Sequence, residues 1–348
     1  MLFKGVIYHM QENVLIGGYT KQTSQGIYQL QFNSQTAQLT PAKLAVKLQG
    51  PTYFAVSNEH ILYTVVQDGE QGGLAAYDMK NNFAYLGSAL QPKNSPAYVE
   101  VSDKRQLVFS ANFHTGIVTI HQIQADKPLA ITDQIQLTGH SIRPEQEESH
   151  PHMAHLAPDG NLVICDYGSD KVFTYSIDDA GKATKMGEFT APAGSAPRHL
   201  VFNPQHPDIA YCICELASIV LVLNYHDGQF EQLQSYPLLP DNYNEDNTAA
   251  AIRISADGQF LYTSNRGHNS IVSFKVSANG QSLEHLQTIK TQGDFPRDFD
   301  FDLTGQYLLV PHQKSNDVTI FKRNLETGYL TFINNDTQVP EGTCIVFY

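Results

Sequence analysis

Several residue types and sequence features are scarce or missing in this chain of 348 residues. It has no tryptophan, only four cysteines, and no apolar run long enough to span a bilayer. The cysteines lie inside strand-like apolar runs without CxxC spacing, at positions Cys165, Cys212, Cys214 and Cys344. We therefore expect buried free thiols in a reducing cytoplasm rather than a zinc site or a disulfide framework. The start of the chain, Met1–Gly5, lacks the apolar run of a signal peptide, which also favours a cytoplasmic location.

Basic side chains are also scarce. There are 22 lysines and arginines against 35 acidic residues, which gives a formal net charge of −13. This balance disfavours nucleic acid and anionic membranes as partners, because both require a basic surface. An anionic small molecule remains compatible with the composition if the few basic groups gather in one place.

Common catalytic motifs and helical periodicity are absent. The sequence contains no GxSxG elbow, no Walker loop and no GxGxxG that opens a helix. Gly17-Gly18-Tyr19-Thr20 ends a strand-like run without a helix after it, so it does not form a phosphate loop. We therefore predict an all-β chain without a nucleotide cofactor or any other cofactor.

What the chain does contain is a repeat along its full length. Six similar strand-like segments recur at spacings of 45 to 55 residues, beginning at Pro51, Pro96, Pro151, Pro197, Ala249 and Pro296. Each runs into a turn, such as Asp159-Gly160 or Asp257-Gly258, and then into a second apolar strand. Asp-Gly between alternating apolar runs is a strong hairpin signal. With third and weaker fourth strands following, the pattern predicts a β-propeller of four-stranded antiparallel blades.

The seventh blade is divided between the two ends of the sequence. Gly342–Phe347 has the pattern of a first strand with no second strand after it, whereas Val14–Tyr19 has the pattern of a second strand with no first strand before it. Pairing them would close the ring and remove the exposed sheet edges. We therefore predict one seven-bladed β-propeller domain over residues 1–348.

The repeat places two sets of positions at one end of the ring. The first residue of each inner strand and the last residue of each second strand lie at the same end of a hairpin, so both should border the central channel. The strand-start positions are Thr52, Ala97, His152, Arg198, Ala250, Arg297 and Thr343. The second-strand end positions are Tyr19, Gln67, Asn112, Asp166, Glu215, Asn265 and His312, with Arg266 directly after Asn265. Since these positions diverge into different polar and charged types, we expect a functional site there.

Arginine is concentrated on this predicted rim. Three of the seven arginines in the chain, Arg198, Arg266 and Arg297, fall on it. They predict an anion site, because a planar guanidinium group binds both oxygens of a carboxylate or phosphate. The alternative is that they pair with acidic residues such as Glu215 or Asp298 and hold neighbouring blades together.

The stretch His150–His155 contains three histidines. His150 and His152 are two residues apart and could share one face of a strand, whereas His155 would point the other way. The rim position favours a functional role for His152, and a packed core position fits His155. Rim carboxylates and amides could also ligate a hard cation such as calcium, but the nearby arginines would compete for them. We therefore predict no metal site.

These motifs resemble those of a known family, the seven-bladed lactonase propellers, which include bacterial 6-phosphogluconolactonase and fungal carboxymuconate cyclase. The resemblance covers nearly the whole chain, and the stretches that carry it are His150–Gly160, Asp166–Asp170, Gly194–Pro204, Cys214–Ser218, Ala250–Gly258, Ser264–His268 and Phe295–Asp298. Two departures concern the substrate: Glu145-Gln146 stands where the family often has Arg-Gln, and His312 stands where asparagine is usual.

The resemblance implies a set of site residues. The family's suspected functional histidine, glutamate and two arginines correspond to His152, Glu215, Arg198 and Arg266. The rim residues that we expect to contact the substrate are Arg297, Asn112, Asp166, Asn265 and His312.

The implied activity is hydrolysis of an anionic sugar lactone, first of all 6-phosphogluconolactone. His152 or Glu215 would act as general base, Arg198 and Arg266 would bind the oxyanion or the substrate anion, and Arg297 would hold a distal phosphate. Two alternatives stay open: a muconate-type lactonising cycloisomerase, and a non-catalytic propeller that binds a partner through its faces.

Overall fold

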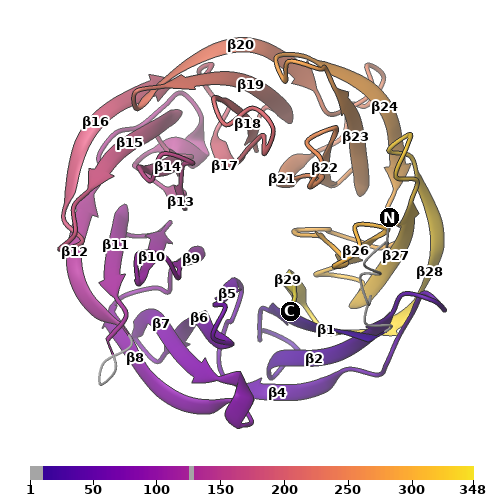
Figure 1. Cartoon of the computed structure of the whole chain (residues 1–348), viewed down its shortest axis with the longest axis horizontal. Coiled ribbons are helices and arrows are strands. Elements are labelled where there is room, and N and C mark those ends of the chain that lie inside the picture. The colour runs from indigo at the N-terminus through magenta and orange to yellow at the C-terminus, as the bar shows by residue number, and fades with distance from the viewer. Residues whose placement is uncertain (1–10, 125–128) are drawn as a thin grey trace, which may run out of the picture.

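Seven antiparallel sheets surround a central axis in the computed structural model, which describes residues 11–124 and 129–348 (Figure 1). The predicted absence of a signal peptide at Met1–Gly5 concerns residues outside these ranges. Six blades are formed by four consecutive strands each, with the first strand innermost and the fourth outermost. The predicted seven-bladed all-β fold is thereby confirmed.

The strand bounds follow the predicted repeat. Three blades are β5 (Phe54–Val56) to β8 (Ala84–Pro92) through β6 (Ile61–Asp68) and β7 (Gln71–Asp78); β9 (Tyr98–Ser102), β10 (Leu107–Asn112), β11 (Ile117–Gln122) and β12 (Ala130–Gln136); and β13 (Pro151–Leu156), β14 (Leu162–Asp166), β15 (Lys171–Ile177) and β16 (Ala183–Thr190). Three more are β17 (Pro197–Phe202), β18 (Ile209–Cys214), β19 (Ile219–His226) and β20 (Gln229–Pro237); β21 (Thr248–Ile254), β22 (Phe260–Arg266), β23 (Ser270–Val276) and β24 (Leu283–Lys290); and β25 (Asp300–Phe301), β26 (Tyr307–Pro311), β27 (Asp317–Arg323) and β28 (Leu330–Gln338).

The seventh blade closes the ring as the sequence predicts. Strand β29 (Gly342–Phe347) pairs antiparallel with β1 (Gln11–Gly18), with Val14 opposite Phe347 and Ile16 opposite Ile345. Strand β1 then pairs with β2 (Gly26–Asn33), and two short outer strands, β3 (Gln38–Leu39) and β4 (Lys43–Lys47), both pair with β2. The last strand of the chain is therefore joined to the first described strand, and the ring of blades is closed.

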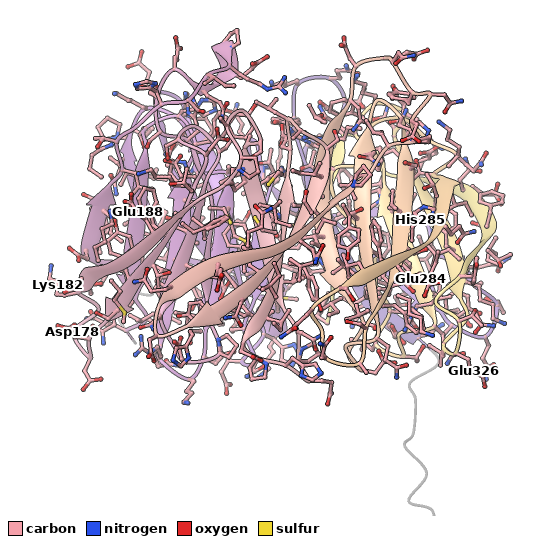
Figure 2. The ribbon with its side chains drawn as sticks, turned by 90° about the horizontal axis from the view of Figure 1, so that it is seen from above. Asp178, Lys182, Glu188, Glu284, His285 and Glu326 are labelled. Carbon is pink, nitrogen blue, oxygen red and sulfur yellow. The ribbon has the colours of Figure 1, made fainter. Side chains whose placement is uncertain are left out.

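Burial explains why the middle strands lack the alternating pattern of a half-exposed sheet. Every residue of β14 and β18 is buried, because blades pack against neighbours on both faces. The outer strands instead carry the polar side chains: Figure 2 shows Glu188 of β16 and Glu284 and His285 of β24 on the periphery, where all three are exposed. The core is thus a ring of apolar contacts between blades.

Several smaller predictions can also be checked against the structure. All four cysteines are buried and free, as predicted. The turn glycines Gly160 and Gly258 have φ angles of 86° and 71°, the left-handed conformation that favours glycine in tight hairpins. The helices among the described residues are two three-residue 3₁₀ turns, Met79–Asn81 and Pro144–Gln146, and none has the length or apolarity to cross a membrane.

Candidate active site

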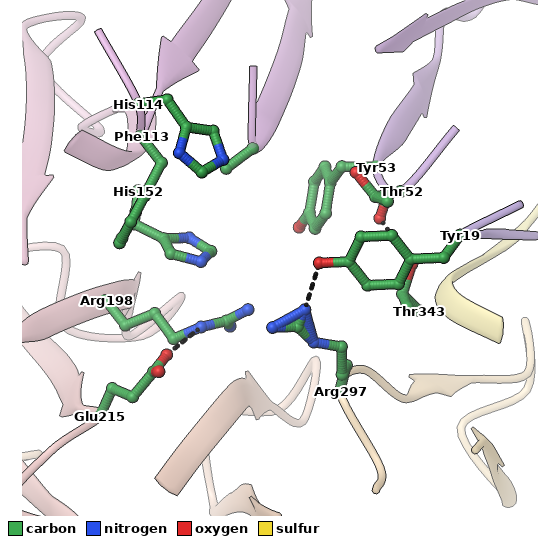
Figure 3. Close-up of a pocket in the computed structure, with 11 residues that line it drawn as sticks. Tyr19, Thr52, Tyr53, Phe113, His114, His152, Arg198, Glu215, Arg297 and Thr343 are labelled. Atoms are coloured by element: carbon green, nitrogen blue, oxygen red, sulfur yellow. Dashed lines mark hydrogen bonds and ion pairs between the residues drawn. The ribbon is translucent and has the colours of Figure 1, made fainter. Parts of the chain in front are cut away.

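A pocket of about 190 Å³ opens at the predicted end of the central channel (Figure 3). Six of its eleven lining residues are strand-start positions, namely Thr52, Ala97, His152, Arg198, Arg297 and Thr343. The other five are Tyr19, Tyr53, Phe113, His114 and Glu215. Every blade except the one that starts with β21 therefore gives its strand-start side chain to this pocket.

Backbone irregularities direct the strand-start side chains into the channel. In β13, Pro151 lies opposite Asp166 and Met153 lies opposite Cys165, so His152 is an extra residue without a partner in the ladder. The same register shift leaves Arg198 unpaired in β17. Such β-bulges re-aim a side chain relative to a regular strand. The shared bulge thus accounts for the direction of the His152 and Arg198 side chains.

Glu215 is an ion-pair centre for two arginines. Its Oε2 lies 2.9 Å from Nε of Arg198 and 2.8 Å from Nη2 of Arg266. The backbone fixes Glu215 between two blades, because its N–H donates to the Ala196 carbonyl at 2.7 Å and its carbonyl accepts from Ala249 at 3.0 Å. The alternative pairing role of the arginines is therefore realised for Arg198 and Arg266.

Arg266 itself does not line the pocket. It is 3% exposed and lies behind Glu215, where Nη2 also donates to the Ala249 carbonyl at 2.8 Å. Contact of Arg266 with the substrate therefore stays a prediction, and the contact that the structure shows is its ion pair with Glu215. Its position fits a residue that orients Glu215.

The charge balance around Glu215 is strongly positive. Burial by itself would raise the pKa of Glu215, but Arg266, Arg198 and Arg297 outweigh that effect and hold the pKa below its ordinary value. Burial lowers the pKa of Arg198 to about 9, with Glu215 opposing and Arg266 adding to the shift, so this group is still cationic at neutral pH. One carboxylate therefore faces three guanidinium groups, which leaves an excess of positive charge at the pocket.

Arg297 is the arginine with the freest access to the cavity. Its Nη1 donates to the phenol oxygen of Tyr19 at 3.0 Å, and its Cζ lies 5.5 Å from the centre of that ring. Its Nε has no hydrogen-bond partner among the described residues. Figure 3 shows the side chains of Arg198 and Arg297 coming from different blades and pointing toward one another. Two like charges in this arrangement favour an anion between them.

Phe113 forms the wall beside His152. The His150 ring stacks on Phe113 at 4.3 Å, and its Nδ1 contacts the Phe113 carbonyl oxygen at 2.7 Å. The His152 ring meets the same phenyl group edge-on at 6.0 Å. His150 therefore holds the pocket wall, while His152 is 8% exposed and belongs to the lining.

His152 is held in its neutral form. Burial, followed by the charges of Arg198 and Arg297, lowers its pKa well below the ordinary value. The ring of His199 lies 5.0 Å away, and its pKa is lowered for the same reasons, burial first and Arg198 next. Burial also raises the pKa of Tyr53 far above its ordinary value, so its phenol remains a proton donor beside these rings. The pocket thus offers a neutral imidazole next to cationic groups.

Four residues predicted to contact substrate are not among the residues that line this pocket. Asn112 donates to the Asn94 carbonyl at 2.7 Å and accepts from the N–H of His114 at 3.1 Å. Asp166 accepts from the His150 N–H at 2.6 Å and from Ser149 Oγ at 2.6 Å.

The other two also have polar partners within the protein. Asn265 donates to the Leu238 carbonyl at 2.9 Å, and His312 Nδ1 lies 2.9 Å from an oxygen of Asp317. Both are fully buried. Each of the four residues lies at the last position of its second strand or directly beside it, and their polar atoms bond to groups in the turn that follows or in neighbouring segments. Contact of these four residues with the substrate stays a prediction.

Sequence reasoning did not select Tyr53, Phe113 or His114, although the repeat contains the signal. Tyr53 directly follows the strand-start residue Thr52, and Phe113 and His114 directly follow Asn112. Side chains one or two positions beyond the chosen columns thus reach the channel where a turn bends inward. His155, expected to be a packed residue, pairs with Glu100 at 2.5 Å away from the pocket lining.

The arrangement suits chemistry on an anionic or carbonyl-containing substrate. Within residues 11–124 and 129–348, no group of three or more His, Cys, Asp or Glu side chains is placed to hold a metal ion. The neutral His152 can accept a proton, and the facing guanidinium groups can stabilise a developing oxyanion.

Comparison with known proteins agrees with this fold. The model of the family described as "Lactonase, 7-bladed beta-propeller" matches residues 13–347. The 6-phosphogluconolactonase of Bacillus subtilis is 35% identical over 340 residues, covering 95% of this chain and 97% of the relative.

Two solved structures are similar over nearly their whole length. A Lactobacillus plantarum protein is 43% identical with a TM-score of 0.95, covering 97% of this chain and 100% of that one. The periplasmic gluconolactonase PpgL of Pseudomonas aeruginosa is 25% identical with a TM-score of 0.90, covering 97% and 99% of the two chains. The relatives thus include proteins named for a phosphorylated and for an unphosphorylated sugar lactone.

Proposed function

Because this chain belongs to the lactonase family of seven-bladed β-propellers, we propose that its lactone-hydrolysing pocket acts on 6-phosphogluconolactone and releases 6-phosphogluconate. The observation that carries this proposal is the excess of guanidinium charge in a buried pocket beside a neutral imidazole. The substrate and the product of this reaction are both anions, and hydrolysis passes through an additional oxyanion. An acidic protein that gathers three of its seven arginines here fits that chemistry.

The first step in the proposed mechanism is attack by water on the lactone carbonyl carbon. His152 accepts one proton from the water as its oxygen forms the new bond to carbon. Negative charge develops on the carbonyl oxygen, and Arg198 and Arg297 stabilise it from opposite sides of the pocket. Glu215 keeps Arg198 in place, and Arg266 keeps Glu215 in place.

The second step breaks the bond between the carbonyl carbon and the ring oxygen. The imidazolium of His152 returns its proton to that oxygen, which becomes a hydroxyl group. A low pKa makes the protonated His152 a strong acid, which favours this return. Glu215 is a poorer candidate for the base, because the arginines stabilise its ionised form and weaken its basicity. The new carboxylic acid ionises at neutral pH.

The direct test is the rate of 6-phosphogluconolactone opening by purified protein, with the spontaneous rate subtracted. We expect saturable hydrolysis that is lost when Arg198 is replaced by alanine and retained when the exposed Lys43 is replaced by alanine. A rate equal to the spontaneous one at all protein concentrations would reject the proposed substrate. Running the same assay with glucono-lactone and with carboxymuconate separates the sugar lactonase from the cycloisomerase alternative.

A cytoplasmic location is part of the same proposal. Four buried thiols without a disulfide fit a reducing compartment. A periplasmic relative exists, so the location needs its own test by cell fractionation. Recovery of the native protein in the periplasmic or secreted fraction would reject it.

A further inference from the structure

A second cavity of about 290 Å³ adjoins the active-site pocket. The two cavities share four wall residues, Tyr19, Thr52, Ala97 and His114. The second one extends from this common wall toward Lys21, Gln49 and Gln67, at the start of the chain and in the blade of β5–β8. We call it the side lobe. A ligand seated between Arg198 and Arg297 could therefore extend an arm into the side lobe without leaving the protein surface.

The charge of the side lobe is positive. Among the described residues, its lining contains the cation Lys21 and no aspartate or glutamate, in a chain with a net charge of −13. Lys21 Nζ lies 4.5 Å from the centre of the Tyr19 ring, whose hydroxyl accepts from Arg297 at 3.0 Å. One phenol therefore separates the cation of the side lobe from the cation of the pocket.

The loop that carries Lys21 is firmly anchored. Both carboxylate oxygens of Glu341 accept backbone N–H groups from four successive residues, at 3.0 Å from Lys21, 3.0 Å from Gln22, 3.2 Å from Thr23 and 3.2 Å from Ser24. Thr20 Oγ1 also accepts from the Gly50 N–H at 3.1 Å. These bonds fix the path of the backbone, so the Lys21 side chain projects from a defined position. The pKa of His114 is lowered, first by burial and then by the charges of His150 and Lys21, so the lysine cation affects the neighbouring imidazole.

We propose that the side lobe binds the phosphate monoester on the exocyclic carbon of the substrate, with Lys21 as its cationic contact. This inference rests on the proposed lactonase function and assigns the second anionic group of the substrate to a separate place. Lysine binds phosphate as a point charge, and a phosphate monoester carries close to two negative charges at neutral pH, so the side lobe should attract it more strongly than a singly charged carboxylate. Arg198 and Arg297 are thereby left for the reacting carbonyl.

The test compares the affinity of three stable ligands by calorimetry: gluconate, 6-phosphogluconate and glucarate, which carries a carboxylate where the phosphate would be. In the unchanged protein we expect 6-phosphogluconate to bind about tenfold or more tightly than the other two. Lys21→Ala should remove most of that ratio, and it leaves the backbone N–H that bonds to Glu341 intact. Lys43→Ala, which removes an exposed lysine from the outer strand β4, is the matched control and should keep the ratio.

Three outcomes would overturn the side-lobe assignment: no preference for 6-phosphogluconate, a preference that survives in Lys21→Ala, or equal binding of glucarate. Failure of the lactonase proposal is a separate result, because it appears as absent catalytic opening of the lactone. A protein that prefers 6-phosphogluconate through Lys21 but hydrolyses no lactone would keep the side lobe and reject the reaction. A protein that hydrolyses phosphorylated and unphosphorylated lactones equally, with no effect of Lys21→Ala, would keep the lactonase reaction and reject the side lobe as the phosphate site.

Discussion

At the scale of single residues, the three rim arginines have different partners, so their substitution should affect different properties of the protein. Arg297 is partly exposed and bonds only to Tyr19 among the described residues, so Arg297→Gln should leave the fold intact. Loss of a charge-assisted contact should weaken 6-phosphogluconate binding by about tenfold or more. Arg266→Gln should instead lower the free energy of unfolding by about 3–5 kcal/mol, because it breaks a buried ion pair.

For both variants, calorimetry measures the affinity for 6-phosphogluconate, and denaturant unfolding measures the free energy of unfolding. Arg105→Gln serves as a control for the loss of an arginine elsewhere, since its guanidinium group bonds to the Ile177 carbonyl away from the pocket. A stable Arg266→Gln with weakened binding would mean that Arg266 touches the ligand after all. An unstable Arg297→Gln would mean that it holds blades together.

The candidate base gives a second prediction at this scale. Because burial, Arg198 and Arg297 lower the pKa of His152, it is already deprotonated through neutral pH. Lactonase activity should therefore be flat from about pH 8 to pH 6.5 and fall only in more acidic solution, as the imidazole takes up a proton. His152→Asn should reduce the turnover number by about 10²–10⁴ with little change in product affinity.

Glu215→Gln provides the comparison. It removes the carboxylate shared by Arg198 and Arg266, so its main effect should be lost stability. Full activity of His152→Asn across the pH range, above spontaneous hydrolysis, would exclude His152 from the mechanism and transfer the role of base to Glu215.

At the scale of strands, ring closure depends on the pairing of β29 with β1. Deletion of residues 342–348 removes the inner strand of the last blade and uncovers Ile16 and Leu309, which are fully buried. The exposed edge of β1 should then pair with other chains, so we expect aggregation or a large loss of stability. Size-exclusion chromatography and thermal unfolding give the readout.

Removal of Tyr348 alone is the control for this deletion, because it keeps the whole of β29. That variant should remain monodisperse to the same degree as the unchanged protein. If the longer deletion were equally soluble and equally stable, the blade would not depend on its C-terminal strand.

Strand-level patterns also explain how much could be predicted from the sequence. The repeat located the blades, the closure and the strand-start column, because each depends on local hydrophobic alternation and turn residues. It could not reveal the bulges that turn His152 and Arg198 inward, since a bulge is a property of two paired strands.

The second-strand column is divided in the structure: Tyr19 and Glu215 line the pocket, and four other members do not. Asn112, Asp166, Asn265 and His312 differ in type, which suggested function, yet each satisfies polar groups in the turn after its strand. Different polar side chains meet the same structural need, so diversity within a column does not by itself indicate a ligand site.

At the scale of the whole molecule, buried histidines should make stability depend on pH. The ring of His121 is 2% exposed, and burial lowers its pKa to about 4. The unfolded chain takes up that proton near pH 6.5 and the folded chain does not, so stability is lost as the pH falls from about 6.5 toward 4. His121 alone should contribute about 3 kcal/mol of that loss.

Urea unfolding between pH 8 and pH 4 measures this contribution, by comparison of the unchanged protein with His121→Leu. The free energy of unfolding of the variant should fall less steeply over this range, whatever its value at pH 8. His140→Gln, a substitution of an exposed loop histidine, should keep the original slope. Identical slopes for all three proteins would show that His121 does not resist protonation in the folded state.

The closure of the ring has a consequence for the synthesis of the protein. The pocket wall joins Tyr19, just after β1, to Thr343 in β29, whose hydroxyl bonds to the Thr52 carbonyl at 3.0 Å. During translation, β29 is the last of these strands to leave the ribosome, so a nascent chain can hold six finished blades and still have no complete catalytic pocket. A chain that ends before β29 would then lack the Thr343 part of the pocket wall and would leave the edge of β1 without its partner strand.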